Sequence, residues 1–160
     1  MGYRSQVACV ISVDVFKREI PILTDVNGDP KYEWVYDKAK FKEMIGFIKL
    51  SRFWELWNTT DADKECFGWR NGKFMFYGNA FKWYPDYEDV KEFHKMFNQM
   101  QNIEGISGCF LRVGEERNDV EEEEFGDDPC YDYFHAFTAM DFSGDEYLGK
   151  RDTDDEEPQA

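Results

Sequence analysis

The chain has 160 residues, of which 18% are aromatic, and its formal net charge is −15. This length suffices for one domain with a sizeable core, and the aromatic content excludes a disordered chain. Residues 1–114 carry 16 acidic and 16 basic side chains, whereas residues 115–160 carry 18 acidic and 3 basic ones. Because the whole negative excess lies in the last 46 residues, the chain is expected to repel nucleic acids and anionic membranes and to favour basic partners.

The first half of the chain predicts a strand, a small hairpin and a helix. Arg4–Phe16 carries apolar residues on both alternating faces, which is typical of a central strand. Asn27–Pro30 has the composition of a turn and would join two short strands. Asp37 can cap a helix whose apolar residues recur at helical spacing as far as Trp57, with a break near Ser51.

The stretch Cys66–Met100 predicts a β-hairpin that leads into a second helix. Asn71-Gly72 lies between two aromatic runs, and this pair tolerates the positive φ angles of a type I′ turn. Asp86 is the expected N-cap of the helix, and Val90 begins an apolar stripe that continues with Phe93, Phe97 and Met100.

Two further strands, Ile106–Val113 and Tyr131–Met140, complete the expected order of elements. This order predicts an α+β fold, best described as a ferredoxin-like split βαβ plan with an extra strand or hairpin. We expect a mostly antiparallel sheet with two helices on one face. Residues 1–142 would form a single domain, and residues 143–160 a disordered acidic tail.

An acidic segment between the last two expected strands is the first candidate for a binding surface. If Val120–Phe125 is a strand, its glutamates alternate between the two faces, and Val120 and Phe125 can anchor it to the core. A rigid array of carboxylates can imitate the charge of duplex DNA and occupy the DNA-binding groove of another protein. The alternative is a solvated loop that keeps the chain soluble. The acidic residues of the candidate surface are Glu115, Glu116, Asp119, Glu121, Glu122, Glu123, Glu124, Asp127 and Asp128.

The aromatic residues offer a second candidate surface. Their number exceeds what a small core easily hides, and Trp and Tyr are favoured as anchors in protein interfaces. Trp69 and Trp83 are therefore candidate partner-binding residues, with burial in the core as the alternative. Neighbouring basic residues of the hairpin resemble a single-strand-binding surface, but the net charge opposes that interpretation.

The sequence offers little for catalysis or metal binding, so no enzymatic activity and no cofactor are expected. The four cysteines, Cys9, Cys66, Cys109 and Cys130, form no metal-binding pair and are expected to be free thiols. Asp25, Asn27 and Asp29 begin like a calcium loop, but the pattern then fails. Cys130 and His135 form one Cys/His pair, but no second pair is present at zinc spacing and nothing in the sequence indicates a nucleophilic thiol. His94 is expected at the edge of the second helix.

The opening residues Met1–Ser5, followed by a strand, resemble the start of a group of small bacteriophage proteins. The stretches FKWYPDYEDVKEF and RVGEERNDVEEEEFGD are also similar to that group. The resemblance implies a phage source and the cytoplasm of a bacterial host, and it supplies no catalytic residues.

These features together predict a non-enzymatic phage protein that binds and inhibits a host protein with a basic, nucleic-acid-binding surface, such as a restriction, CRISPR-type or nuclease complex. The alternative is a phage accessory or structural-assembly protein without mimicry. Neither a nucleic acid nor a membrane is an expected direct partner.

Overall fold

The computed structural model describes residues 4–58, 64–116, 118–127, 134–136 and 140–142. Its strands and helices form an α+β fold whose described strand pairs are all antiparallel. The strands are β1 (Ser5–Val13), β2 (Val15–Thr24), β3 (Pro30–Tyr36), β4 (Lys64–Arg70), β5 (Lys73–Phe81), β6 (Ile106–Gly114), β7 (Val120–Phe125), β8 (Phe134–Ala136) and β9 (Met140–Phe142). The helices are α1 (Lys38–Leu50), α2 (Arg52–Asn58) and α3 (Glu88–Met100).

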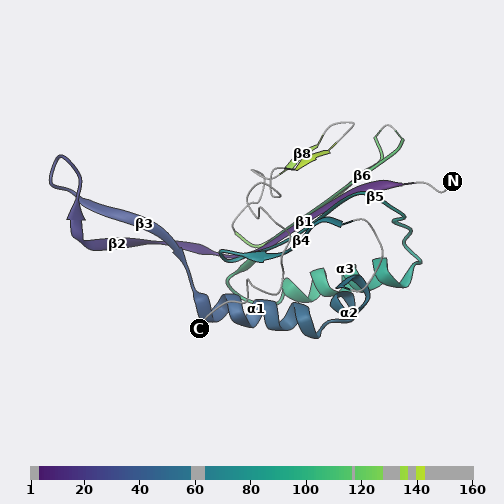
Figure 1. Cartoon of the computed structure of the whole chain (residues 1–160), viewed down its shortest axis with the longest axis horizontal. Helices are drawn as coiled ribbons and strands as arrows, with labels where there is room; N and C mark the ends of the chain where they lie inside the picture. The colour runs from purple at the N-terminus through teal and green to yellow at the C-terminus, as the bar shows by residue number, and fades with distance from the viewer. Residues whose placement is uncertain (1–3, 59–63, 117, 128–133, 137–139, 143–160) are drawn as a thin grey trace.

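The main sheet has five strands in the order β4-β5-β1-β6-β7. The three helices lie on one face of this sheet, and the short β8–β9 pair lies on the other side (Figure 1). The predictions of an α+β fold and a mostly antiparallel sheet are therefore confirmed. The first predicted helix is divided into α1 and α2 at Ser51, where the break was expected.

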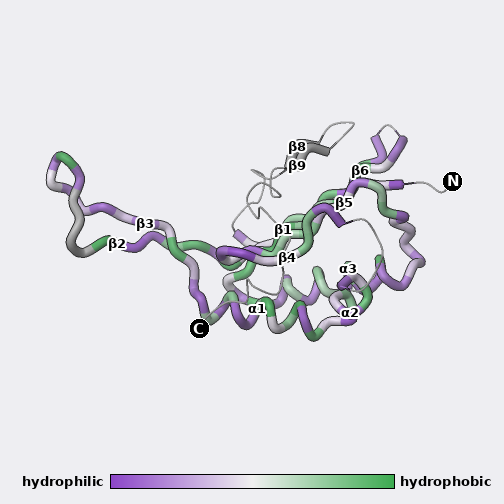
Figure 2. Tube along the Cα trace, in the orientation of Figure 1, coloured by the Kyte–Doolittle hydropathy of each residue, from purple (hydrophilic) through white to green (hydrophobic). Residues whose placement is uncertain are grey.

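Strand β1 is the centre of the sheet, because it pairs with β5 on one side and β6 on the other. Its alternating residues are buried on both faces, as the sequence predicted. Val7, Cys9 and Ile11 belong to the cluster on the helix side, whereas Ala8 and Val10 belong to a second cluster on the opposite face. Figure 2 shows this central region mainly in hydrophobic colours.

Aromatic side chains fill the core between the sheet and the helices. Phe53 of α2 lies at its centre, and its ring centroid is 5.5–6.4 Å from those of five other aromatic residues. The partners of Phe53 come from α2, β4, β5 and α3, and they are Trp57, Phe67, Phe74, Phe76 and Phe93. Each such pair adds a directional contribution to the burial of apolar area.

Local signals in the sequence place several element boundaries correctly. Asn71 and Gly72 have φ angles of 52° and 85° and form the tight turn between β4 and β5. The Asp37 carboxylate accepts hydrogen bonds from the backbone N–H groups of Ala39 and Lys40, which confirms it as the cap of α1.

The start of α3 differs from the prediction. The N-cap position is Tyr87 rather than Asp86, and no side chain caps it. The helix instead has Glu88 and Asp89 in its first turn, where negative charge interacts favourably with the helix dipole. The predicted apolar stripe that begins at Val90 is buried.

Strands β2 and β3 form a separate two-stranded arm that extends away from the sheet (Figures 1 and 2). The arm is longer than the small hairpin predicted, because it begins at Val15, two residues after β1 ends. At its tip the Asp25 carboxylate accepts hydrogen bonds from the N–H groups of Asn27 and Asp29. This carboxylate closes a turn, which accounts for the calcium-like spacing.

Replacement of the central core ring should strongly destabilise the protein. Phe53→Ala is expected to lower the free energy of unfolding by about 3–5 kcal/mol, because Phe53 is fully buried and the cavity cannot collapse completely. Phe47→Ala on α1 is a matched control, since that ring is 51% exposed, and it should change stability by less than about 1 kcal/mol. Urea unfolding followed by circular dichroism measures both. Equal effects of the two substitutions would contradict this packing.

The buried Cys9 thiol should make stability depend on alkaline pH. Burial raises its pKa well above the ordinary value, and charge on Cys109 and Glu123 raises it further. An unfolded chain loses this proton above about pH 8.5 while the folded chain keeps it. The unfolded state is therefore favoured progressively, and the free energy of unfolding should fall by up to about 1.4 kcal/mol per pH unit above that pH.

Cys9→Ala removes this contribution and serves as the control. We expect the stability difference between the natural chain and the variant to shrink as the pH rises from 8 to 10 in denaturant titrations. A difference that stays constant over this range would mean that the thiol ionises equally in both states.

Candidate functional site

The acidic segment contains an ordered strand at the edge of the main sheet. Val120–Phe125 is β7, and its only described neighbour in the sheet is β6. Glu121 lies opposite Arg112 and Glu123 opposite Phe110, so these two glutamates share the helix-side face. Glu122 and Glu124 alternate with them and share the opposite face. The strand therefore displays four carboxylates in fixed positions.

An ion pair fixes the start of this strand. Nη1 and Nη2 of Arg112 donate to the two carboxylate oxygens of Asp119 at 3.2 and 2.8 Å, and Nη1 also donates to Ser5 Oγ. The N–H of Gly114 donates to the carbonyl oxygen of Asp119, which closes the connection between β6 and β7. Asp119, which was predicted as a partner-binding residue, thus pairs with Arg112 within the domain.

Two more of the predicted acidic residues lie in the connection before β7. One carboxylate oxygen of Glu115 accepts a hydrogen bond of 2.8 Å from the backbone N–H of Arg4, which ties the connection to the start of the chain. Glu116 is exposed, and its carbonyl oxygen accepts from the N–H of Asp119. These two residues extend the acidic surface past the start of the strand.

The far end of β7 is held by packing. The Phe125 ring lies 5.0 Å from that of Phe97 in an edge arrangement and covers Gly108, where a side chain would collide with it. Gly126 has a φ angle of 87° and packs closely against Ser107, which places Asp127 at the end of the sheet. The prediction that both apolar flanks anchor the strand is confirmed for Phe125 only, because Val120 is exposed. Asp128 lies outside the described residues.

A small polar cavity of about 250 Å³ lies beside β7 and contains groups that the sequence did not connect. Nδ1 of His94 is 3.4 Å from Glu123 Oε2, and its Nε2 is 3.9 Å from Glu121 Oε1. Nε1 of Trp83 and Oε1 of Glu121 are buried there without a hydrogen-bond partner in the described structure. Since His94 is on α3, far away in sequence, only the fold brings these groups together.

The two tryptophans predicted as interface anchors lie in the core, which corrects that prediction. Trp69 is 1% exposed and Trp83 is 6% exposed. Trp69 faces the helices from β4 and packs against Trp54, while the ring of Trp83 stacks on Phe110. Three of the exposed large aromatic side chains are instead on the arm, and they are Phe16, Tyr32 and Trp34.

The cysteines that the structure describes are buried, and no metal-binding group is found among the described residues. Cys9, Cys66 and Cys109 are buried free thiols, as predicted, and Cys130 lies outside the described residues. The described residues contain no group of three or more side chains placed to hold a metal ion, and none of their helices is long and apolar enough to cross a membrane.

Comparison with known proteins gives no relative on which to base a function. No protein-family model, curated protein or solved structure significantly matches this chain. The functional argument therefore depends on the acidic strand β7, its supports and the exposed arm.

Loss of the Arg112–Asp119 pair should loosen β7 selectively. Asp119→Asn removes the charge that Arg112 binds, and we expect faster hydrogen exchange at the β7 amides with little change in β1. Glu122→Gln removes one exposed charge from β7 without touching this pair and is the control. Exchange measured by mass spectrometry separates the two variants. If β7 exchanges equally in both, the ion pair does not hold the strand.

Proposed function

We propose that this is a phage-encoded acidic protein that acts in the bacterial cytoplasm and inhibits a host protein that handles nucleic acid. Its β7 surface would occupy the basic groove of that host protein in place of DNA. The observation that carries this proposal is that four consecutive glutamates occupy an ordered edge strand.

The spacing of charge along β7 supports this mimicry. Successive residues of an antiparallel strand are about 3.4 Å apart, and one strand of duplex DNA also carries one charge per about 3.4 Å of the helix axis. Asp127, held beyond the end of β7, continues the line of carboxylates, and Glu116 extends it at the other end. Counting both faces, β7 has the linear charge density of one DNA strand, and the carboxylates on each single face are about 6.8 Å apart.

Binding rather than catalysis is the mode of action that we propose. The side chains of Glu122, Glu123 and Glu124 are exposed, Glu121 is half-buried, and the described cavity beside the strand is small. The proposed partners are host defence or nucleic-acid-processing proteins with basic surfaces, because opposite charge speeds their encounter with this surface.

For the core of the fold we propose the ferredoxin-like split βαβ plan. The sheet order β4-β5-β1-β6 supports it, with α1 and α2 between β1 and β4 and α3 between β5 and β6. Strand β7 would then be an addition beside β6, and the arm an insertion after β1.

Neutralisation of β7 should abolish capture of the host partner. The affinity-tagged protein would be incubated with bacterial lysate, and bound proteins identified by mass spectrometry, with and without duplex DNA as competitor. The test variant replaces Glu121, Glu122, Glu123 and Glu124 by Gln, which keeps side-chain shape and removes four charges. We expect a captured nucleic-acid-binding protein that DNA displaces, and at least a tenfold loss of capture by the variant.

A control variant removes the same number of charges from exposed positions outside β7. It carries the substitutions Glu43→Gln, Glu65→Gln, Asp86→Asn and Glu104→Gln. This control should retain capture, and so should deletion of residues 152–160, because an ordered strand has less conformational entropy to lose on binding than a chain terminus. Capture should weaken as salt is added, since exposed charges are screened over about 8 Å at physiological ionic strength. If the amount of captured partner changes neither with the β7 substitutions nor with added salt, the electrostatic mechanism is overturned.

A further inference from the structure

The β2–β3 arm carries an aromatic face that the acidic-strand proposal does not use. Lys17 pairs with Trp34 and Glu19 with Tyr32, so these side chains lie on the same face of the arm. Trp34 is 70% exposed, the most exposed aromatic ring described. Nζ of Lys17 lies 4.2 Å from the centre of the Tyr32 ring, so one cation already contacts an aromatic ring on this face.

The base of the arm is fixed to the body of the protein. The Tyr36 ring meets that of Phe41 edge-on at 5.4 Å and lies against Gly72 at the turn between β4 and β5. Backbone hydrogen bonds join Val13 to Gly72 and Asp14 to Gly105. The position of Trp34, two residues before Tyr36, is therefore set relative to the sheet.

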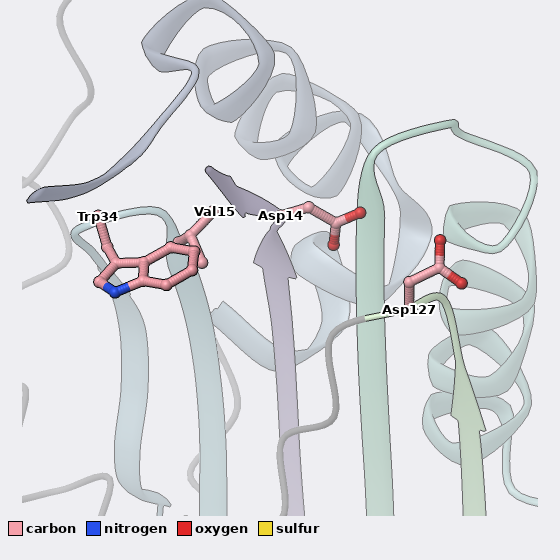
Figure 3. Close-up of a pocket in the computed structure, with 4 residues that line it drawn as sticks. All are labelled: Asp14, Val15, Trp34 and Asp127. Carbon is pink, nitrogen blue, oxygen red and sulfur yellow. The ribbon is translucent and has the colours of Figure 1, made fainter. Parts of the chain in front are cut away.

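Two carboxylates line the same cavity as this part of the arm. Asp14 follows β1 and accepts a hydrogen bond of 2.6 Å from Ser107 Oγ, and Ser107 also packs against Gly126, just before Asp127. Asp14 and Asp127 line an open cavity of about 490 Å³, whose described lining residues are Asp14, Val15, Trp34 and Asp127. Figure 3 shows the Trp34 ring beside Val15 on one side and the two carboxylates on the other.

We propose that this cavity receives an arginine side chain from a basic protein partner. A guanidinium group is planar and weakly hydrated, so it can stack on an indole ring while its N–H groups bind carboxylates. Val15 provides apolar contact for the methylene groups of the same side chain. The two aspartates repel an anionic occupant such as a phosphate.

This inference rests on the proposed function, because it supposes that the partner surface is basic. It adds a second contact and a preference for arginine over lysine. Asp127 connects the two sites, since it lies two residues after the end of β7 and also lines the cavity. A basic segment that lies along β7 would thus reach the cavity at the end of the strand.

Fluorescently labelled nona-arginine and nona-lysine test this assignment by anisotropy titration with the full-length protein. Trp34→Ala should weaken nona-arginine binding about two- to fivefold, as expected for one exposed cation–π contact, and should affect nona-lysine less. Trp34→Tyr should restore most of the affinity. Phe16→Ala removes a 51% exposed ring from the opposite face of the arm and should change neither affinity. Thermal unfolding would verify that each variant is folded.

The assignment is overturned if Trp34→Ala and Phe16→Ala have the same effect, or if Trp34→Ala weakens both peptides equally. The variant with four glutamines in β7 makes the two proposals separable. If that variant loses nona-arginine while Trp34→Ala retains it, β7 binds the basic chain and the cavity assignment fails. If Trp34→Ala loses the arginine preference while the β7 variant binds normally, the cavity assignment holds and the proposed role of β7 fails.

Discussion

The burial of β1 on both of its faces and along both of its edges is the constraint on which the rest of the structure depends. Strands β5 and β6 complete its hydrogen bonds, and the aromatic layer of α2 and α3 covers one face. Among the described strands, the acidic strand β7 pairs with β6 alone, and the arm leaves the sheet just after β1 ends. Both candidate binding surfaces are therefore at the periphery, where charge and exposed aromatic rings do not compromise the core.

An edge strand with four glutamates needs specific support, because neighbouring like charges repel one another. The structure provides it at both ends, through the Arg112–Asp119 pair and through the packing of Phe125 on Phe97. Charged side chains on an edge also discourage pairing with strands of other chains. The property that keeps this edge from aggregation is the same one that would attract a basic surface, so a single strand can serve solubility and recognition together.

The sequence predicted those parts of the fold that depend on neighbouring residues. The Asn71-Gly72 turn, the Asp37 cap and the buried stripe of α3 each follow from local chemistry and are confirmed. Trp69 could not be placed correctly, because alternation assigns a residue to a face of a strand but does not reveal what covers that face.

Part of the candidate site could be predicted from the sequence by the same reasoning. Arg112 on β6 and Asp119, just before β7, are seven residues apart, so a firm assignment of β7 would have suggested their pairing. No local signal connects His94 with Glu123, or Asp14 with Asp127, because those pairs depend on the packing of α3 and on the order of the strands.

The attachment of the arm at one place determines how its length can change in evolution. Since Val15 and Tyr36 lie opposite each other, the arm begins and ends at one place on the domain, and its length can change without moving the core. Side chains of a strand return to the same face every second residue. Insertion of two residues in each strand would therefore lengthen the arm and keep Trp34 on the same face, whereas insertion of one residue would move the aromatic side chains to the opposite face.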